Sequence, residues 1–518
     1  MIQPDFAVWP SLASWSLRRI LLAELILGLS LLAILCIRLD KPFHGAYERV
    51  SYAHVLMARN HLRYGLDVTR GMGSLAAGGL QLQDLGGHWW IHHPPLMPLY
   101  VAGWFRVFGE SFAVARLSAI ALTVLALPLV GFIARKLGGP AAGLWACLLY
   151  AASGTAVWDG RRPEYFQLAL LLMLLALAFY VSWREKPTSG KWGGFLVSMS
   201  LACLVDWPPF LFAGGLAAHL CATDGRRGLW RAVGLLGIGA ASFGVFLIHV
   251  IWIAGSQSVA YLFNLLGQET RDASRLRAFW NLCRSCGTHT GVVASLAFLA
   301  SFLPVTGLNV MSRGTVITLS VYGLLSSQFF LVWTFLHGYV AVWFLMPAMV
   351  LGGGLALSAL LERISSIGWR RGIAILVGVA ILGQGAAYGI LRHRQDNWYA
   401  PQREIIATVR AEIAPQSWVA SPLKGFEPFS AVYETDCHLF WGVQEISELE
   451  PLVRRTRVLY VLVPKPESTR SFWSDLGSEG RRAYGVIRLN EHARLLRGAT
   501  CRDLGSYDLY TLESSRSP

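Results

Sequence analysis

The sequence predicts a polytopic α-helical membrane protein with about eleven transmembrane helices, followed by a small C-terminal α/β domain. Of its 518 residues, 54% are hydrophobic and 15% are charged, whereas a soluble chain carries about 25% charged residues. Apolar runs of roughly 18 residues or more recur along residues 1–391. Their apolar residues follow the 3.6-residue period of a helix. They do not show the alternation of apolar and polar residues that is typical of barrel strands, which excludes an outer-membrane barrel.

Eleven spans are predicted within the first 391 residues. They cover residues 20–38, 112–134, 140–158, 164–183, 193–206, 208–223, 232–254, 290–309, 315–336, 338–359 and 372–391. The first run is read as a signal anchor, because no small-x-small cleavage site follows it. The apolar stretch from Leu96 to Phe108 is too short to cross a bilayer, so a re-entrant or interfacial helix is predicted there.

Short basic loops predict the orientation. Arg18 and Arg19 precede the first span, and further basic residues fall at 135–136, 184–191, 226–231, 313 and 363–371. Alternation of the spans places all of these on one side, which the positive-inside rule assigns to the cytoplasm. We therefore expect an inner (plasma) membrane protein whose segments 39–111, 159–163, 255–289 and 392–518 face the periplasm or exterior.

Residues 392–518 differ from the membrane domain 1–391 in their pattern of expected secondary structure. Helices are expected at Arg403–Ile413 and Ile446–Val453, and strands at Ser417–Ser421, Arg457–Val463 and Tyr507–Leu512. Strands interleaved with helices predict a small α/β domain. Cys437 and Cys501 both fall in this domain, and a disulfide between them is expected on the outer side of a membrane.

The net charge of +14 is not confined to the cytoplasmic loops. The outer segments hold Arg49, Arg59, Arg63, Arg70, Arg161, Arg162, Arg271, Arg275, Arg277 and Arg284. Two explanations stay open: contact with anionic lipid headgroups, or a pocket for a phosphate-bearing substrate. No nucleic-acid partner is expected on that side.

The first outer segment holds two groups of candidate functional residues. Glu48 stands at the start of an expected amphipathic helix, as a general base or as an ordinary surface carboxylate paired with Arg49 or Tyr52. His92 and His93 precede two prolines and the short apolar helix. His93 then lies near a helix N-terminus, where an anion is favoured, unless both histidines are plain interfacial residues.

Two later outer segments add candidates. A tight hairpin between two spans holds Trp158-Asp159-Gly160-Arg161-Arg162-Pro163-Glu164-Tyr165. Its ionisable groups suggest a binding role, although Glu164 also stands where a carboxylate stabilises a helix start. His337 and Tyr339 open another span on the same side. Cys283-x-x-Cys286 is followed by His289. This pattern favours a local disulfide or two free thiols over a zinc site, because zinc needs about four ligands and no second group of ligand residues is visible.

The order of these features resembles the GT-C superfamily of integral-membrane glycosyltransferases. The resemblance covers roughly residues 20–350 and is greatest for the branch of protein O-mannosyltransferases, lipid A aminoarabinose transferases and lipopolysaccharide galacturonosyltransferases. It rests on Glu48, Tyr52-Ala53, Met57, Gly65, His93-Pro94-Pro95-Leu96, Phe108-Gly109, Arg116, Glu164 and His337-x-Tyr339. Two departures are visible: Arg49 replaces the second acid of the family's pair, and His93 replaces a lysine.

This resemblance implies inverting transfer of one sugar from a polyprenyl-phosphate-linked donor to an envelope lipid, polysaccharide or protein, at the outer face of the bilayer. Glu48 falls on the family's catalytic acid. Expected substrate contacts are Arg59, His92, His93, Arg161, Arg162, Glu164, His337 and Tyr339. No cofactor and no metal are expected, because one carboxylate and scattered histidines make a poor cage for a hard cation.

Two alternatives without catalysis remain at this stage. A polytopic transporter is disfavoured because no internal repeat is visible and the polar groups gather at one surface. A membrane-anchored envelope assembly factor is suggested by residues 392–518.

Overall fold

A computed structural model describes residues 17–43, 48–77, 89–268, 275–329, 338–394, 400–421, 428–441, 458–464, 500–504 and 507–513. The chain folds as two compact units. The helical unit comprises Met1–Lys41 and Ile91–Arg394, and the mixed unit comprises Pro42–Trp90 and Gln395–Pro518. Residues 42–90 therefore belong with the C-terminal residues, although most of the helical unit separates the two in sequence.

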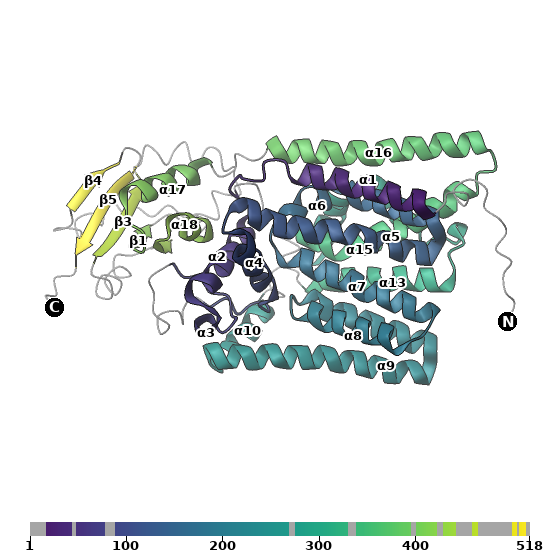
Figure 1. The fold of residues 1–518 in the computed structure, drawn as a ribbon, viewed down its shortest axis with the longest axis horizontal. Helices are drawn as coiled ribbons and strands as arrows, with labels where there is room; N and C mark the ends of the chain where they lie inside the picture. Colours follow the sequence, from purple (N-terminus) through teal and green to yellow (C-terminus); the bar gives the residue numbers. More distant parts are fainter. Residues whose placement is uncertain are drawn as a thin grey trace. The chain divides into compact units, whose positions relative to one another are not determined.

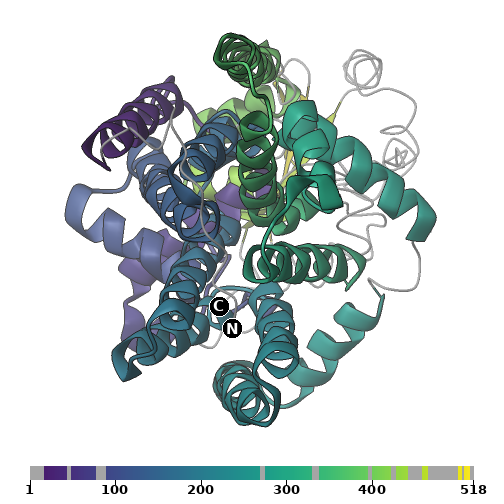
Figure 2. The same cartoon turned by 90° about the vertical axis from the view of Figure 1, so that its right-hand side faces the viewer.

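The helical unit is a bundle whose long helices run side by side (Figure 1), and Figure 2 shows them nearly end on. Its helices are α1 (Leu17–Leu35), α4 (Leu96–Phe108), α5 (Phe112–Ala151), α6 (Gly154–Val157), η2 (Asp159–Arg161), α7 (Tyr165–Glu185), α8 (Ser189–Cys203), α9 (Pro208–Ala254), α10 (Gln257–Gln268), α11 (Arg275–Ser285), η3 (Cys286–Thr290), α12 (Val292–Ala300), η4 (Pro304–Thr306), α13 (Val310–Phe329), α15 (Gly338–Glu362) and α16 (Ile367–Arg394). Among the described residues, five helices are long and apolar enough to cross a membrane: α5, α7, α9, α15 and α16. The chain is thus a helical membrane protein.

Two of the long helices each carry two of the predicted spans. α5 changes direction at Gly139 and α9 at Gly225, where φ is +83° and +53°. A side chain rarely adopts such positive φ values, so glycine permits a reversal without an intervening loop. The predicted pairs 112–134 with 140–158 and 208–223 with 232–254 therefore fall on α5 and α9. The total of eleven spans stays a prediction.

One predicted span is broken in the structure. The prediction of a continuous helix over residues 290–309 is wrong, because α12 covers only the nine residues Val292–Ala300. Gly291 has a φ of +117° before the helix, and Gly307 has a φ of +61° after it. Pro304, which has no backbone N–H to donate, opens the separate 3-10 turn η4. A helix of nine residues is too short to cross a bilayer alone.

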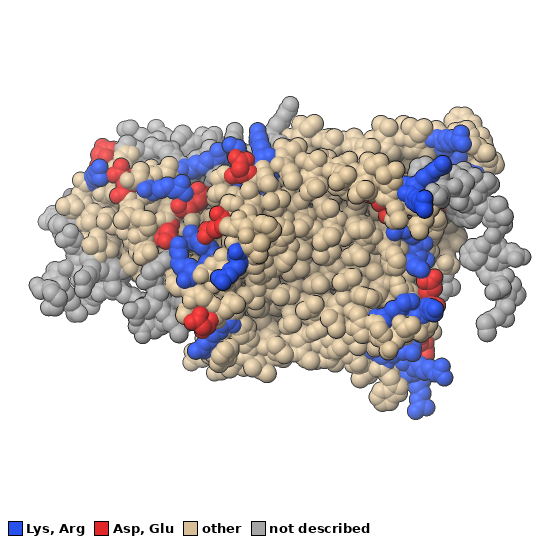
Figure 3. Space-filling view, viewed as in Figure 1, with Lys and Arg blue, Asp and Glu red and all other residues tan. Residues whose placement is uncertain are grey.

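The predicted basic loops lie at one end of the helical unit. Ion pairs join them to neighbouring helices: Arg135 to Glu24, Lys136 to Glu185, and both Arg184 and Arg231 to Asp224. Figure 3 shows Lys and Arg gathered at the right-hand end and a broad uncharged band beside them. This arrangement agrees with a membrane-embedded bundle whose loops of one sign share one surface.

The short helix after the two prolines forms as predicted. α4 spans Leu96–Phe108, with Pro95 at its N-cap and Gly109 at its C-cap. Gly109 has a φ of +84°, which ends the helix at little cost because glycine has no Cβ.

The mixed unit holds α2 (Arg49–Tyr64), α3 (Leu66–Thr69), α17 (Ala400–Glu412), α18 (Pro428–Thr435) and one sheet. The strands are β1 (Trp418–Ser421), β2 (His438–Trp441), β3 (Val458–Pro464), β4 (Thr500–Asp503) and β5 (Tyr507–Glu513), in the order β2-β1-β3-β5-β4. β1 pairs in parallel with β2 and β3, and β5 is antiparallel to β3 and β4. Its core packs Ile405, Ile406 and Val409 of α17 against Val419 and Leu462 of the sheet.

The predicted helix at 403–413 and the strands near 417, 457 and 507 are confirmed. The predicted helix at Ile446–Val453 lies outside the described residues.

The structure contains no disulfide among the described cysteines, so the predicted Cys437–Cys501 bond is wrong. Cys437 is buried immediately before β2, whereas Cys501 is exposed on β4 at the opposite edge of the sheet. Since neighbouring strands lie about 4.8 Å apart, the two edges are separated by roughly 20 Å, beyond the reach of a disulfide. Cys283 and Cys286 also carry free thiols.

Candidate active site

Glu48 lies at the N-cap of α2 with only 1% of its surface exposed. Its side chain makes no capping hydrogen bond to the helix backbone. Tyr52, one turn further, packs edge-on against Phe43 and donates its hydroxyl to Glu434 over 2.5 Å. All residues from Ser51 to His61 are buried, so the exposed polar face expected of an amphipathic surface helix is not seen there. The carboxylate is therefore held in a buried position.

Arg59 shares α2 with Glu48, as predicted, and its guanidinium contacts the end of α18. Nη1 donates to the carbonyl of Tyr433 over 2.7 Å, and Nη2 lies 3.3 Å from the Asp436 carboxylate. The guanidinium also stacks on the Tyr433 ring at 4.8 Å. These contacts fasten α2 to the C-terminal residues within the mixed unit.

Glu434, beside these contacts, has an unusual environment for a carboxyl group. Burial raises its pKa, although the hydrogen bond from Tyr52 and the charge of Arg410 act in the opposite direction. Such a carboxyl is well suited to accept a hydrogen bond from a buried tyrosine.

In the helical unit, His93 is bound to a carboxylate that was not among the predicted site residues. Its Nδ1 lies 2.9 Å from Oδ1 of Asp206, in the turn between α8 and α9, and its ring stacks on Tyr165 at 4.1 Å. The next residue, Trp207, donates its indole N–H to the carbonyl of His92 over 2.7 Å. Burial, with His93 as a smaller influence, lowers the pKa of His92 to about 4. His92 is therefore neutral at physiological pH.

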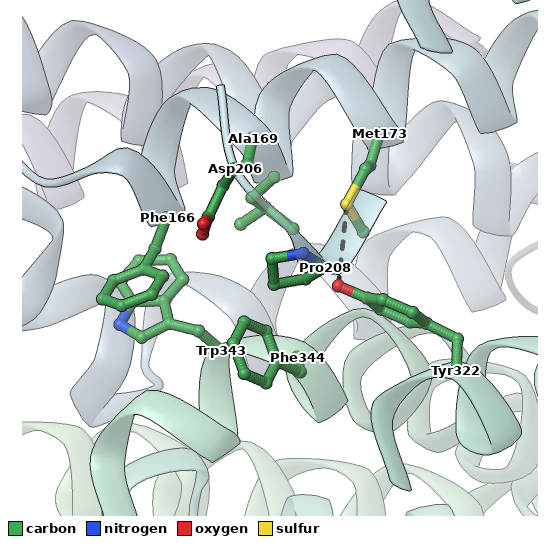
Figure 4. A pocket seen from close by; sticks show the side chains of 9 residues that line it. Phe166, Ala169, Met173, Asp206, Pro208, Tyr322, Trp343 and Phe344 are labelled. Atoms are coloured by element: carbon green, nitrogen blue, oxygen red, sulfur yellow. Dashed lines mark hydrogen bonds between the residues drawn. The ribbon is translucent and has the colours of Figure 1, made fainter. Parts of the chain in front are cut away.

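Asp206 also lines a small apolar cavity (Figure 4). The remaining lining residues are Phe166, Ala169, Leu170, Met173, Pro208, Tyr322, Trp343 and Phe344. In Figure 4 the carboxylate is the charged group drawn among aromatic and aliphatic side chains.

The hairpin between α5 and α7 forms a buried ionic cluster around Arg162, which is 1% exposed. Its Nη1 donates to Asp159 over 2.6 Å, and its Nε donates to Glu164 over 2.9 Å. Glu164 occupies the N-cap position of α7, yet its side chain makes no capping bond. The carboxylate binds Arg162 and makes no hydrogen bond to the helix backbone, although a negative charge at this position still favours the dipole of α7.

Three further residues surround this cluster. Nδ1 of His289 lies 2.6 Å from the Tyr388 hydroxyl and 3.9 Å from the Asp159 carboxylate. Nε of Arg392 donates to the Tyr388 hydroxyl over 3.0 Å. Burial, followed by the charges of Arg392 and Arg162, lowers the pKa of His289 to about 3. His289 is therefore a neutral hydrogen-bonding residue here, and the described chain contains no group of ligands able to hold a metal ion.

Arg161 points into a different environment from Arg162. Its guanidinium stacks on Trp158 at 4.4 Å and donates to the carbonyl of Ile37 over 2.8 Å. It therefore ties the hairpin to the end of α1. Tyr339 lies in the first turn of α15, whereas His337 lies outside the described residues.

The structure thus brings the predicted residues together in groups. His92 and His93 meet Asp206 and Trp207, and Arg162 meets Glu164, while Glu48 and Arg59 lie on α2 of the mixed unit. Sequence reasoning missed Asp206, Tyr388 and Arg392, whereas Asp159 was named in the hairpin but was not assigned as a site residue. A signal for Asp206 was present: like Asp159, it is an acid beside a tryptophan in a tight turn between two predicted spans.

Comparisons with known proteins agree with the predicted resemblance. Residues 92–252 match the family described as dolichyl-phosphate-mannose-protein mannosyltransferase. ArnT from Cupriavidus metallidurans bound to undecaprenyl phosphate has a similar structure, with 12% identity, a TM-score of 0.62, and coverage of 97% of this chain and 100% of that chain. The Archaeoglobus fulgidus oligosaccharyltransferase in the apo form is similar at 11% identity and a TM-score of 0.52, covering 89% and 71%. No curated protein sequence matches the chain.

At these identities the solved structures show a shared fold, and the family match supplies the class of reaction. Residues 92–252 match this family, and the chain is a membrane glycosyltransferase of the GT-C type that uses a polyprenyl-phosphate-linked sugar donor.

Proposed function

We propose that this enzyme moves one sugar from a polyprenyl-phosphate donor to an envelope lipid, polysaccharide or protein, with inversion, at the outer face of the inner membrane. The observation that carries the proposal is the family match, joined to a fold shared with an ArnT that binds undecaprenyl phosphate. The match to a glycosyltransferase family also argues against the transporter and the non-catalytic assembly factor.

Glu48 is the proposed general base. It would take the proton from an acceptor hydroxyl or amine as that atom attacks the anomeric carbon. The new bond forms on the face opposite the phosphate, the carbon–oxygen bond to phosphate breaks, and polyprenyl phosphate leaves. A carboxylate that the surrounding chain holds in place suits this role, because a general base must be positioned to take the proton.

The donor phosphate requires positive or hydrogen-bonding groups, and His93 is our first candidate. It stands just before the N-terminus of α4, where helix N–H groups favour anions, and 16% of its side chain is exposed. His92, Glu164, His337 and Tyr339 remain proposed substrate contacts.

The arginines predicted to hold the phosphate already have partners in the chain. Arg59 binds the end of α18, Arg161 binds Ile37, and Arg162 binds two carboxylates. For these three residues, direct donor contact would require an exchange of partners. We therefore propose that these arginines stabilise the site and that His93 contacts the donor phosphate directly.

The test is replacement of Glu48 by glutamine in the purified, detergent-solubilised enzyme. Removal of a general base typically lowers turnover about 100-fold or more, so consumption of lipid-linked sugar should fall by at least this factor. The melting temperature should change little, because glutamine keeps the shape of the side chain.

Glu110→Gln is the matched control, since Glu110 is an exposed carboxylate in the loop after α4. It should keep wild-type turnover. Wild-type turnover in Glu48→Gln would remove Glu48 as the base, and a product with the donor's anomeric configuration would contradict inversion.

A further inference from the structure

Asp206 is a carboxylate in an apolar environment. It is 2% exposed, and the cavity beside it is lined by Phe166, Met173, Trp343 and five other apolar or aromatic residues. Placing a carboxylate in such surroundings is costly unless hydrogen bonds compensate. Two such bonds are present: one with Nδ1 of His93 over 2.9 Å, and one from the backbone N–H of Trp207 over 2.8 Å.

The contact with Asp206 determines the state of the His93 ring. When a carboxylate accepts a hydrogen bond from Nδ1, that nitrogen carries the proton, and the chemistry of Nε2 is thereby defined. The stack on Tyr165, with an angle of 23° between the rings, fixes the plane of the imidazole. Tautomer and orientation are thus both set within the helical unit.

Exposure separates the roles of the two side chains. The His93 side chain is 16% exposed, whereas that of Asp206 is 3% exposed. A ligand can therefore reach the imidazole but not the carboxylate. Asp206 acts on a ligand only through His93.

The α8–α9 turn makes a second contact with the neighbouring residue His92. The indole N–H of Trp207 donates a hydrogen bond to the carbonyl of His92. This bond restrains the backbone and leaves the imidazole untouched. The two contacts can be removed separately, so a role in positioning the ring can be told apart from a role in holding the loop.

We propose that Asp206 is a positioning residue that holds His93 with Nδ1 protonated, so that Nε2 acts on the phosphate of the lipid-linked donor. This inference rests on the proposed function. To the proposed function it adds Asp206, which is 113 positions from His93 in sequence. It also gives the two ring nitrogens of His93 different roles.

The informative variants replace one ring nitrogen at a time. In His93→Asn the amide N–H₂ takes the place of Nδ1 and keeps the bond to Asp206, but nothing replaces Nε2. His93→Gln places an amide near Nε2 and loses the bond. Asp206→Asn keeps the size of the side chain and removes its charge. Trp207→Phe is the control, because it removes the bond to the His92 carbonyl and keeps an aromatic ring against Phe243 and Phe246.

Two readouts are needed: the Kd for undecaprenyl phosphate by native mass spectrometry, and the KM and kcat for a lipid-linked sugar. His93→Asn and Asp206→Asn should each weaken undecaprenyl phosphate binding and raise donor KM about 10- to 100-fold, which is the effect expected from loss of one hydrogen bond to a charged group. The double variant should be no weaker than His93→Asn alone, because the two residues act as one unit. Trp207→Phe should change binding less than threefold.

The outcomes separate this inference from the proposed function. If His93→Asn folds and binds undecaprenyl phosphate like the wild type, Nε2 has no role and the inference is overturned, whatever Asp206→Asn does. If binding falls as expected but the wild type transfers no sugar, the inference stands and the proposed function fails. If the wild type does not bind undecaprenyl phosphate, both are overturned.

Discussion

At the scale of single residues, the arginines of the predicted outer segments show that residues of one type can have different roles. Arg162 lies between two carboxylates, whereas Arg161 stacks on an indole and binds a backbone carbonyl. Adjacent positions in the chain therefore serve an ionic cluster and a packing contact. A surplus of positive charge in a sequence does not by itself identify a phosphate site.

Arg162→Ala should destabilise the helical unit. Removal of one partner from a buried ion pair typically costs about 3–5 kcal/mol, because here Asp159 and Glu164 would be left without their cation. The measurement is the melting temperature of the purified protein in detergent.

Arg106→Ala is the control, since Arg106 is exposed in the last turn of α4. It should leave the melting temperature unchanged. An unchanged melting temperature for Arg162→Ala, together with a raised donor KM, would instead support the predicted contact between Arg162 and the donor phosphate.

At the scale of elements, α2 and α18 are joined by charged contacts from two successive turns of α2. Arg59 and Arg63 both reach the carboxylate of Asp436, at 3.3 and 2.6 Å. Asp436 has a φ of +57°, a conformation that asparagine also tolerates better than most residues. The junction therefore offers a substitution that changes the charge without straining the backbone.

Asp436→Asn should loosen the contact between α2 and α18. Hydrogen bonds to charged groups contribute about 1.5–3 kcal/mol each, so amide hydrogen exchange in α18 should accelerate by roughly 10-fold or more. The peptides that cover Pro428–Thr435 report the effect.

Asp508→Asn in β5 is the control, and it should leave exchange in α18 at the wild-type rate. Unchanged exchange in Asp436→Asn would show that the backbone bond from Arg59 to Tyr433 holds the helices together without the ion pairs.

The elements differ in how well the sequence predicted them. The bounds of α4 were predictable, because prolines precede it and glycine ends it. β3 and β5 were predictable from β-branched residues and alternation. The break after α12 was not foreseen, since hydropathy does not register the conformations of Gly291 and Gly307. The contacts of the candidate site were the least accessible: His93 finds Asp206 across 113 positions, and one sequence carries no record of such pairs.

At the scale of the whole molecule, the basic loops predict which end of the helical unit faces the cytoplasm. A reporter active only outside the cytoplasm, fused after Leu391, should be active, because alternation places residues 392–518 outside. The same reporter fused in the short turn between α7 and α8 should be inactive.

The complementary measurement uses a reporter that works only in the cytoplasm, fused at the same two sites. Activity after Leu391 would reverse the predicted orientation and place the C-terminal residues in the cytoplasm.

The interleaving of the two units along the chain has a consequence for biosynthesis. Arg59 binds Tyr433, and 374 positions separate them. At a synthesis rate of about 5–20 residues per second, α2 is made roughly 20–75 s before its partner helix exists. During that interval the nascent α2 lacks the α18 contacts that later cover its buried polar side chains. Assembly of the mixed unit is thus a late event, completed only after the membrane helices have been synthesised.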